Sequence, residues 1–241
     1  MMARGHATLG ALGSSVVAFW PLHLDPLNSL IFIAAGAGFS LVPDLDEPKS
    51  TISQQFGPIS KAVSGFTRYM AGGHRKATHT WPMILVMGGL GWLSTLYLPV
   101  GGFLLATAFI LGIRTVMPDY ISLMQAKVLP GALLMGGIIG ISGVLDPRVL
   151  LVAPPLGILL HSLGDWPTPM GIPWFWPMRR TYSLNWFRAG DEREYGAIIP
   201  IMLFLLLLVM AVTLVPATAS WFNEHGDPFQ FLKDYRGVMR Y

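Results

Sequence analysis

The chain contains seven long apolar segments, and this pattern limits the folds open to it. Each segment is about 15 to 19 residues long, close to the roughly 20 mostly apolar residues with which a helix crosses a bilayer. Backbone polar groups in lipid are satisfied inside a helix. The sequence therefore predicts an all-α, polytopic membrane bundle of about seven transmembrane helices. The segments are Ala7–Leu22, Leu27–Val42, Pro82–Leu98, Gly101–Met117, Val128–Leu145, Val149–Leu163 and Ala197–Val215.

These segments differ in how well they fit a bilayer. The last is the clearest, because an uninterrupted apolar run from Leu203 to Val209 lies at its centre. The first, second and sixth are short, so each is open to a second interpretation as a buried or re-entrant helix. We expect one membrane-embedded domain over residues 1–241, with motif-bearing polar loops at residues 43–81 and 165–196 and a tail at residues 216–241.

The composition excludes the other broad classes of protein. Charged residues make up 12% of the chain, against about 25% in soluble domains. A soluble surface with so few charges would expose large apolar patches, and the chain is too apolar to be disordered. The net charge of +3 is not concentrated in one basic run, so we expect no nucleic-acid partner. Because the chain has no cysteine, any metal must be bound by His and carboxylate groups.

The two polar loops have different compositions. In the first, residues 58–70 place four apolar side chains at helical spacing, which predicts an amphipathic helix lying on the membrane or on the bundle. The four are Ile59, Val63, Phe66 and Met70. The second loop combines four of the eight Trp residues with Arg179, Arg180 and Arg188, a composition typical of the headgroup interface.

Crossing parity places the polar motifs on one side of the membrane. If all seven segments span, odd-numbered helices begin, and even-numbered helices end, on the same side. Every His and Asp of the motifs described next lies at such a point. The same side carries twelve of the sixteen Lys and Arg residues. By the positive-inside rule, we expect this side to face the cytoplasm.

Seven side chains on this side have the chemistry of metal ligands. Each short motif alone has a more ordinary explanation, such as a helix-ending turn or a basic loop, but together they favour a metal centre. Imidazole with carboxylate suits Zn²⁺, Mn²⁺ or Fe²⁺, so we expect one to three divalent ions, zinc before the others. Which aspartate of the pair at 44 and 46 binds is left open. The candidates are His6, Asp44, Asp46, His74, His79, His161 and Asp165.

The same motifs carry a family resemblance over roughly residues 1–82 and 155–195. In order, they are Gly5-His6, Pro43-Asp44-Leu45-Asp46-x-Pro48-Lys49-Ser50, Gly73-His74-Arg75-x-x-Thr78-His79-Thr80 and His161-x-x-x-Asp165-x-x-Thr168-Pro169-x-Gly171. This resembles the family of LexA-regulated, inner-membrane-associated metal-dependent hydrolases. It is more distantly similar to the helical zinc phospholipases C and nucleases. The resemblance implies that the seven His and Asp side chains are ligands or lie near them, with Glu194 as a further candidate. The extra apolar helices over residues 101–145 depart from the compact members.

These observations predict a multi-pass protein of a prokaryotic inner membrane with its site on the cytoplasmic face. The expected activity is metal-dependent hydrolysis of a phosphoester, which could be lipid-linked, by a metal-activated water. Asp46 or Glu194 would act as general base or bridging ligand, and Arg75 would pair with phosphate. The expected partners are membrane lipid and a phospholipid or other phosphoester substrate. The alternatives are a metal-ion or small-solute transporter and a non-catalytic membrane interaction protein.

Overall fold

The computed structural model describes residues 1–54, 57–116 and 144–225, which are mostly helical apart from a long irregular segment at residues 166–191. An isolated bridge between Ile172 and Tyr182 is the β-type pairing found within them. The α-helices are α1 (Ala3–Phe19), α2 (Pro26–Phe39), α3 (Pro58–Ala71), α4 (Trp81–Leu96), α5 (Leu98–Val116), α7 (Pro147–Asp165) and α8 (Ile199–His225). Three 3₁₀ turns, η1 (Val42–Asp46), η2 (Ile52–Gln54) and η3 (Ala77–His79), and a π-turn, η5 (Glu194–Ile198), join them.

The helices confirm the all-α class, whereas the count of seven membrane spans is not confirmed. Three stretches are long and apolar enough to cross a membrane, namely Pro26–Asp46, Pro147–Asp165 and Glu194–Pro216. Two further apolar helical stretches, Trp81–Leu96 and Pro99–Gly112, are shorter. The expected segment Val128–Leu145 and the end of the tail lie almost wholly outside the described residues. The physical difference is one of length, because α1 has 17 residues and α4 has 16.

The core forms where α7 packs against α2, α4 and α5. Phe32, Leu150 and Ile158 are fully buried there. Helices come very close at glycine, as a Cβ built on Gly38 would lie 1.7 Å from the carbonyl oxygen of Ala108. Small residues permit such backbone contact between helices in lipid. This packing fixes the ends of α2 and α7, from which four of the seven candidate ligands come.

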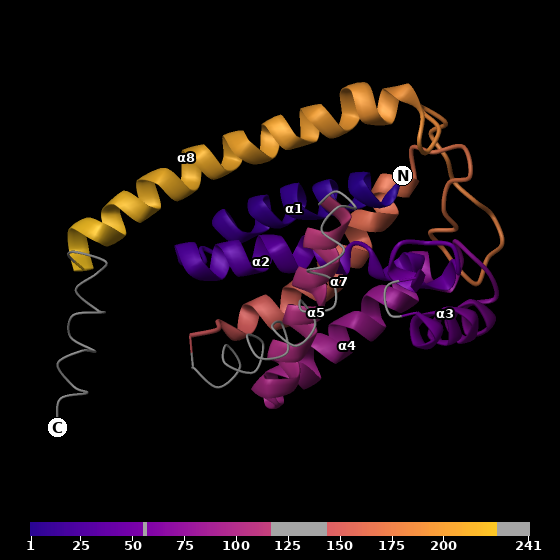
Figure 1. Cartoon of the computed structure of the whole chain (residues 1–241), viewed down its shortest axis with the longest axis horizontal. Helices are drawn as coiled ribbons and strands as arrows, with labels where there is room; N and C mark the ends of the chain where they lie inside the picture. Colours follow the sequence, from indigo (N-terminus) through magenta and orange to yellow (C-terminus); the bar gives the residue numbers. More distant parts are fainter. Residues whose placement is uncertain (55–56, 117–143, 226–241) are drawn as a thin grey trace.

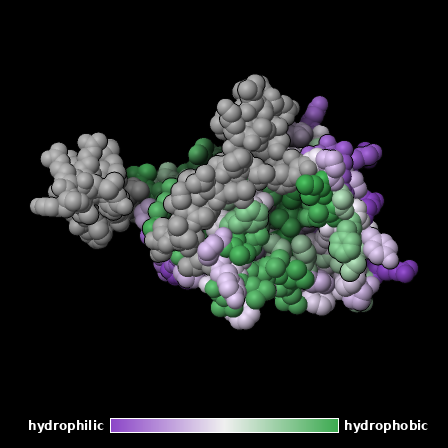
Figure 2. Space-filling view, turned by 60° about the horizontal axis from the view of Figure 1, so that its bottom comes forward, coloured by the Kyte–Doolittle hydropathy of each residue, from purple (hydrophilic) through white to green (hydrophobic). Residues whose placement is uncertain are grey.

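Helix α8 lies along the outside of this bundle, beside α1 (Figure 1). Its apolar side chains are largely exposed, with Phe204 and Leu207 each 65% accessible. An exposed helix this apolar is unfavourable in water but suits lipid. In the space-filling view, hydrophobic side chains cover the middle of the visible face (Figure 2). Most strongly hydrophilic residues lie toward the right-hand end, where Figure 1 places α3.

The amphipathic segment predicted at residues 58–70 is the helix α3, and its contacts show which of its faces meets the bundle. Its buried side is small, formed by Ser60, Ser64 and Ala71, and it packs on η1 and η2. The four apolar side chains instead point away from the bundle, with Ile59 74% and Phe66 66% exposed. The helix therefore rests on the bundle through small residues and presents an apolar face outward.

Candidate metal centre

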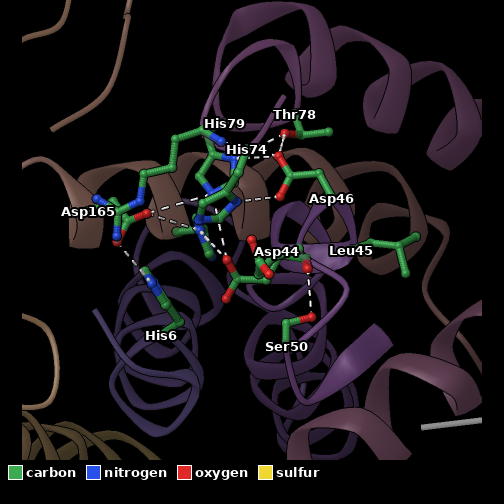
Figure 3. A network of polar contacts seen from close by, with 12 residues as sticks. His6, Asp44, Leu45, Asp46, Ser50, His74, Thr78, His79 and Asp165 are labelled. Carbon is green, nitrogen blue, oxygen red and sulfur yellow. Dashed lines mark hydrogen bonds and ion pairs between the residues drawn. The ribbon is translucent and has the colours of Figure 1, made fainter. Parts of the chain in front are cut away.

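The candidate ligands meet at one end of the bundle although they come from five different segments (Figure 3). His6 lies in the first turn of α1, and Asp44 and Asp46 lie on η1, directly after α2. His74 follows α3, and His79 ends η3 just before α4. His161 and Asp165 occupy the last turn of α7, where their spacing of four residues puts both on one face. All seven side chains thus belong to one polar network.

Four ligand atoms from this network converge on a common point. Asp44 Oδ1 lies 3.7 Å from both His79 Nε2 and His161 Nε2. Asp165 Oδ2 lies 3.6 Å from His79 Nε2 and 3.5 Å from His161 Nε2. A tetrahedral ion bound at about 2.0–2.2 Å separates its ligand atoms by about 3.3–3.6 Å. The spacing is therefore too long for direct hydrogen bonds and close to that of a tetrahedral N₂O₂ site.

The polar atoms facing this point are buried without partners. His79, His161 and Asp165 are at most 1% exposed. Within the described residues, His79 Nε2, His161 Nε2 and Asp165 Oδ2 have no hydrogen-bond partner. Leaving such groups unsatisfied costs about 1–3 kcal/mol each, more for a charged group. Three orphaned atoms directed at one point fit a bound cation, so the donor set suits the divalent metal that the sequence predicts.

Two more imidazoles flank these four residues. The ring of His6 stacks on His161 with centroids 3.7 Å apart, and its Nε2 is 3.2 Å from Asp165 Oδ1. On the other side, the His74 ring makes an edge contact with His79 at 5.2 Å. Two sets of three have ligand atoms all within 4.8 Å of one another, namely His6, His161 and Asp165, and Asp44, His74 and His79. The network therefore offers donors for more than one ion.

The two aspartates of η1 have different surroundings. Asp46 is fully buried, and both of its oxygens are occupied: Oδ1 is 2.6 Å from His74 Nδ1, while Oδ2 accepts from Thr78 Oγ1 and, at 3.3 Å, from the backbone N–H of Arg75. Asp44 is 18% exposed. It faces the point where the imidazole nitrogens converge. The geometry thus favours Asp44 as the ligand and Asp46 as the group that orients His74.

Hydrogen bonds fix which nitrogen His161 and His79 present. His161 Nδ1 donates to the carbonyl oxygen of Ser40 at 2.6 Å, which leaves Nε2 for an ion. Thr78 uses its only proton to reach Asp46, so at 3.0 Å it accepts from His79 Nδ1. Such outer contacts orient metal-binding histidines. The Ser40 carbonyl carries no sequence motif, so it could not be identified before the fold was known.

The charge state of His79 depends on its two aspartate neighbours. Burial lowers the pKa of the imidazole, but the Asp44 and Asp46 carboxylates outweigh it and raise the pKa to about 9. When no ion is bound, this ring is therefore protonated at neutral pH. An ion that binds at Nε2 must displace that proton.

Two residues that the sequence predicts to act in catalysis, Arg75 and Glu194, have hydrogen-bond partners within the protein. Arg75, at a positive φ of 55°, donates to Asp165 Oδ1 at 2.9 Å and to Thr168 Oγ1 at 2.8 Å. Its guanidinium is thus engaged with the network. Glu194 is fully buried and accepts the backbone N–H groups of Met2 and Gly190, both at 2.7 Å. Its oxygens fasten the loop before α8 to the start of α1.

A cleft of about 530 Å³ lies beside the network. Its wall includes His74 and Arg75, so it shares two side chains with the polar network. The His74 side chain is 21% exposed, whereas the imidazoles of His6, His79 and His161 are buried. The network is therefore buried within the bundle, and the cleft reaches it through His74 and Arg75.

Comparison with known proteins identifies a family whose name refers to the inner membrane. The model of the YdjM inner membrane protein family matches residues 1–222. Two curated relatives named "Inner membrane protein YdjM", from Escherichia coli (strain K12) and Shigella flexneri, are each 29% identical over 146 residues. That stretch is 60% of this chain and 48% of each relative, so it spans about half the relatives' length. No solved structure matches the chain.

Proposed function

The chain belongs to the YdjM inner membrane protein family, and we propose that it is a membrane-bound, metal-dependent hydrolase of phosphoester bonds. The observation that carries the proposal is the convergence of three orphaned, buried atoms with Asp44 Oδ1 at ligand-to-ligand distances of 3.5–3.7 Å. His79, His161, Asp44 and Asp165 would hold the first ion. His6 or His74 would complete a second site beside it.

Chemistry at this site rests on a small number of side chains. A divalent ion held there supplies Lewis-acid activation of water and of a phosphoryl oxygen. His74 Nε2 is available at the mouth of the cleft because Nδ1 is bound to Asp46. Arg75 balances the charge of Asp165 and fixes the position of its carboxylate. A closed structural metal site would leave no such approach for substrate.

The position of the cluster supports hydrolysis over transport. Its residues lie at the ends of α2 and α7 and the starts of α1 and α4. Transporter sites usually lie near the middle of the bilayer, between broken helices. The proposal includes a multi-pass topology with the cluster on the cytoplasmic face, which the basic loops support. Regulation by LexA, which the motif resemblance implies, is a separate part of the proposal. Measuring transcript levels with and without LexA would test it.

The proposal is tested by the metal content of detergent-purified protein, measured by inductively coupled plasma mass spectrometry. Wild type is compared with the double variant His161→Ala, Asp165→Ala. His23→Ala is the matched control, because that exposed histidine lies in the loop between α1 and α2, at the end of α1 opposite His6. Near-stoichiometric Zn, Mn or Fe that disappears only in the double variant is expected. The loaded protein should then hydrolyse bis(p-nitrophenyl) phosphate.

Other results would contradict the proposal in distinct ways. Bound metal without hydrolysis, together with metal flux into reconstituted vesicles, would assign the cluster to transport. No metal in any form of the protein, even after reconstitution with Zn²⁺, would leave an interaction role.

A further inference from the structure

We propose that the 530 Å³ cleft beside the cluster binds the phosphate headgroup of a membrane lipid. The inference rests on the proposed function, because it names the substrate class that would reach the metal centre. Fourteen residues line the cleft, and they divide into a cationic group and an apolar group. The two groups match the two parts of an anionic lipid.

The cationic group supplies the charge that a phosphate needs. Arg75, Lys76 and Arg179 line the cleft, and its lining includes no Asp or Glu. Because Arg75 is already bound to Asp165 and Thr168, Lys76 and Arg179 are the cations left for a ligand. Both are exposed. Arginine pairs with phosphate through two parallel N–H groups, and lysine adds a point charge.

The apolar group separates a lipid from a soluble phosphate. Met70, Met170, Met178 and Trp176 line the same cleft, and the three methionines are 62–65% exposed. Inorganic phosphate has no apolar part to contact this surface, whereas the glycerol and first acyl carbons of a lipid would cover it. Flexible, polarisable methionine side chains suit a surface that meets mobile chains.

The outward face of α3 extends this apolar surface. Met70 belongs both to the cleft and to the exposed apolar face of α3, which continues through Phe66, Val63 and Ile59. The same helix carries the exposed Lys61 and Arg68. A helix with apolar and basic faces binds at the headgroup level, most strongly where the lipids are anionic. The mouth of the cleft would therefore open where lipid headgroups lie.

The test measures binding, not hydrolysis, on metal-stripped protein in detergent. Isothermal titration uses three probes: dihexanoyl phosphatidic acid, dihexanoylglycerol and inorganic phosphate. The cleft variant is Lys76→Ala with Arg179→Ala. Its matched control is Lys49→Ala with Arg180→Ala, which removes the same charges from exposed positions outside both the cleft lining and α3.

The expected result is that wild type binds the phosphatidic acid at least about tenfold more tightly than either other probe. The cleft variant should lose about tenfold or more, as expected for hydrogen bonds to a charged group, while the control stays within about twofold. Equal affinity for inorganic phosphate would make this a soluble-anion site and overturn the proposal. Equal loss in the control, or no binding, would also overturn it. Because metal content is measured separately, the lipid site and the hydrolase proposal can fail independently.

Discussion

Replacing Asp46 by asparagine separates the group that orients a ligand from the ligand itself. The Asp46 carboxylate accepts from His74 Nδ1 at one oxygen and from Thr78 Oγ1 and the Arg75 backbone at the other. Asparagine keeps the shape but turns one acceptor into an N–H₂ donor. The group that faces this N–H₂ either loses its bond or accepts from it, and in both cases the contacts that leave the Nε2 atoms of His74 and His79 free are disturbed.

The size of the effect follows from the role assigned to Asp46. Loss of an outer partner typically weakens metal binding by about 10–100-fold, or about 1.4–2.7 kcal/mol. Asp44→Asn should cost more, because Asp44 contributes an atom to the convergent set. Zn²⁺ affinity would be measured by competition with a chromophoric chelator. Asp25→Asn is the matched control, because Asp25 caps the far end of α2 and asparagine caps equally well.

Two outcomes would refute this reasoning. If Asp46→Asn lowers the Zn²⁺ affinity as much as Asp44→Asn, then Asp46 is itself a ligand. If it leaves the affinity within about twofold of wild type, then the contacts of Asp46 do not orient the site. Circular dichroism and size-exclusion chromatography of each variant would show that the fold is retained.

The remaining predictions concern protonation, packing and Glu194. Because the His79 pKa is raised to about 9, the metal-free ring carries a proton below that pH. Zn²⁺ affinity should then rise about tenfold per pH unit from 7 toward 9 and level off above it, with proton release visible by calorimetry in buffers of different ionisation enthalpy. Gly38→Ala should destabilise the protein by about 1–3 kcal/mol or more, because the new Cβ would meet the Ala108 backbone. Gly89→Ala should be neutral or slightly stabilising in thermal melts, because no atom lies within 4 Å of a Cβ built there. Glu194→Gln should lower the melting temperature but keep the metal content, because Glu194 binds two backbone N–H groups. If the variant loses metal, Glu194 contributes to the metal site.

The helical class could be predicted because it depends on local properties. Segment length and hydropathy place α2, α7 and the start of α8 within a few residues of their observed bounds, although α8 continues to His225, beyond the predicted end at Val215. The number of membrane spans could not be predicted in the same way. Helices such as α4 fall just short of a full span, and their placement depends on which neighbours cover them.

The sequence also could not predict which face of α3 packs on the bundle. Its apolar stripe was visible at residues 59–70, but a stripe of this kind packs as readily on a bundle as on lipid. The decision came from Ser60 and Ser64, whose small side chains let the helix sit closely on η1 and η2. Local periodicity contains no information about that partner surface.

By itself, the sequence determined the chemical type of the site, because imidazole and carboxylate groups at helix ends restrict the choice of ligand wherever they lie. Only the tertiary structure decided their roles. It gave Asp44 and Asp46 different surroundings, tied Arg75 to Asp165, and engaged Glu194 with the backbone N–H groups of Met2 and Gly190. The physical reason is that each role depends on hydrogen bonds between residues far apart in the chain, such as His161 with Ser40, 121 residues away. Such contacts form only when the helices pack.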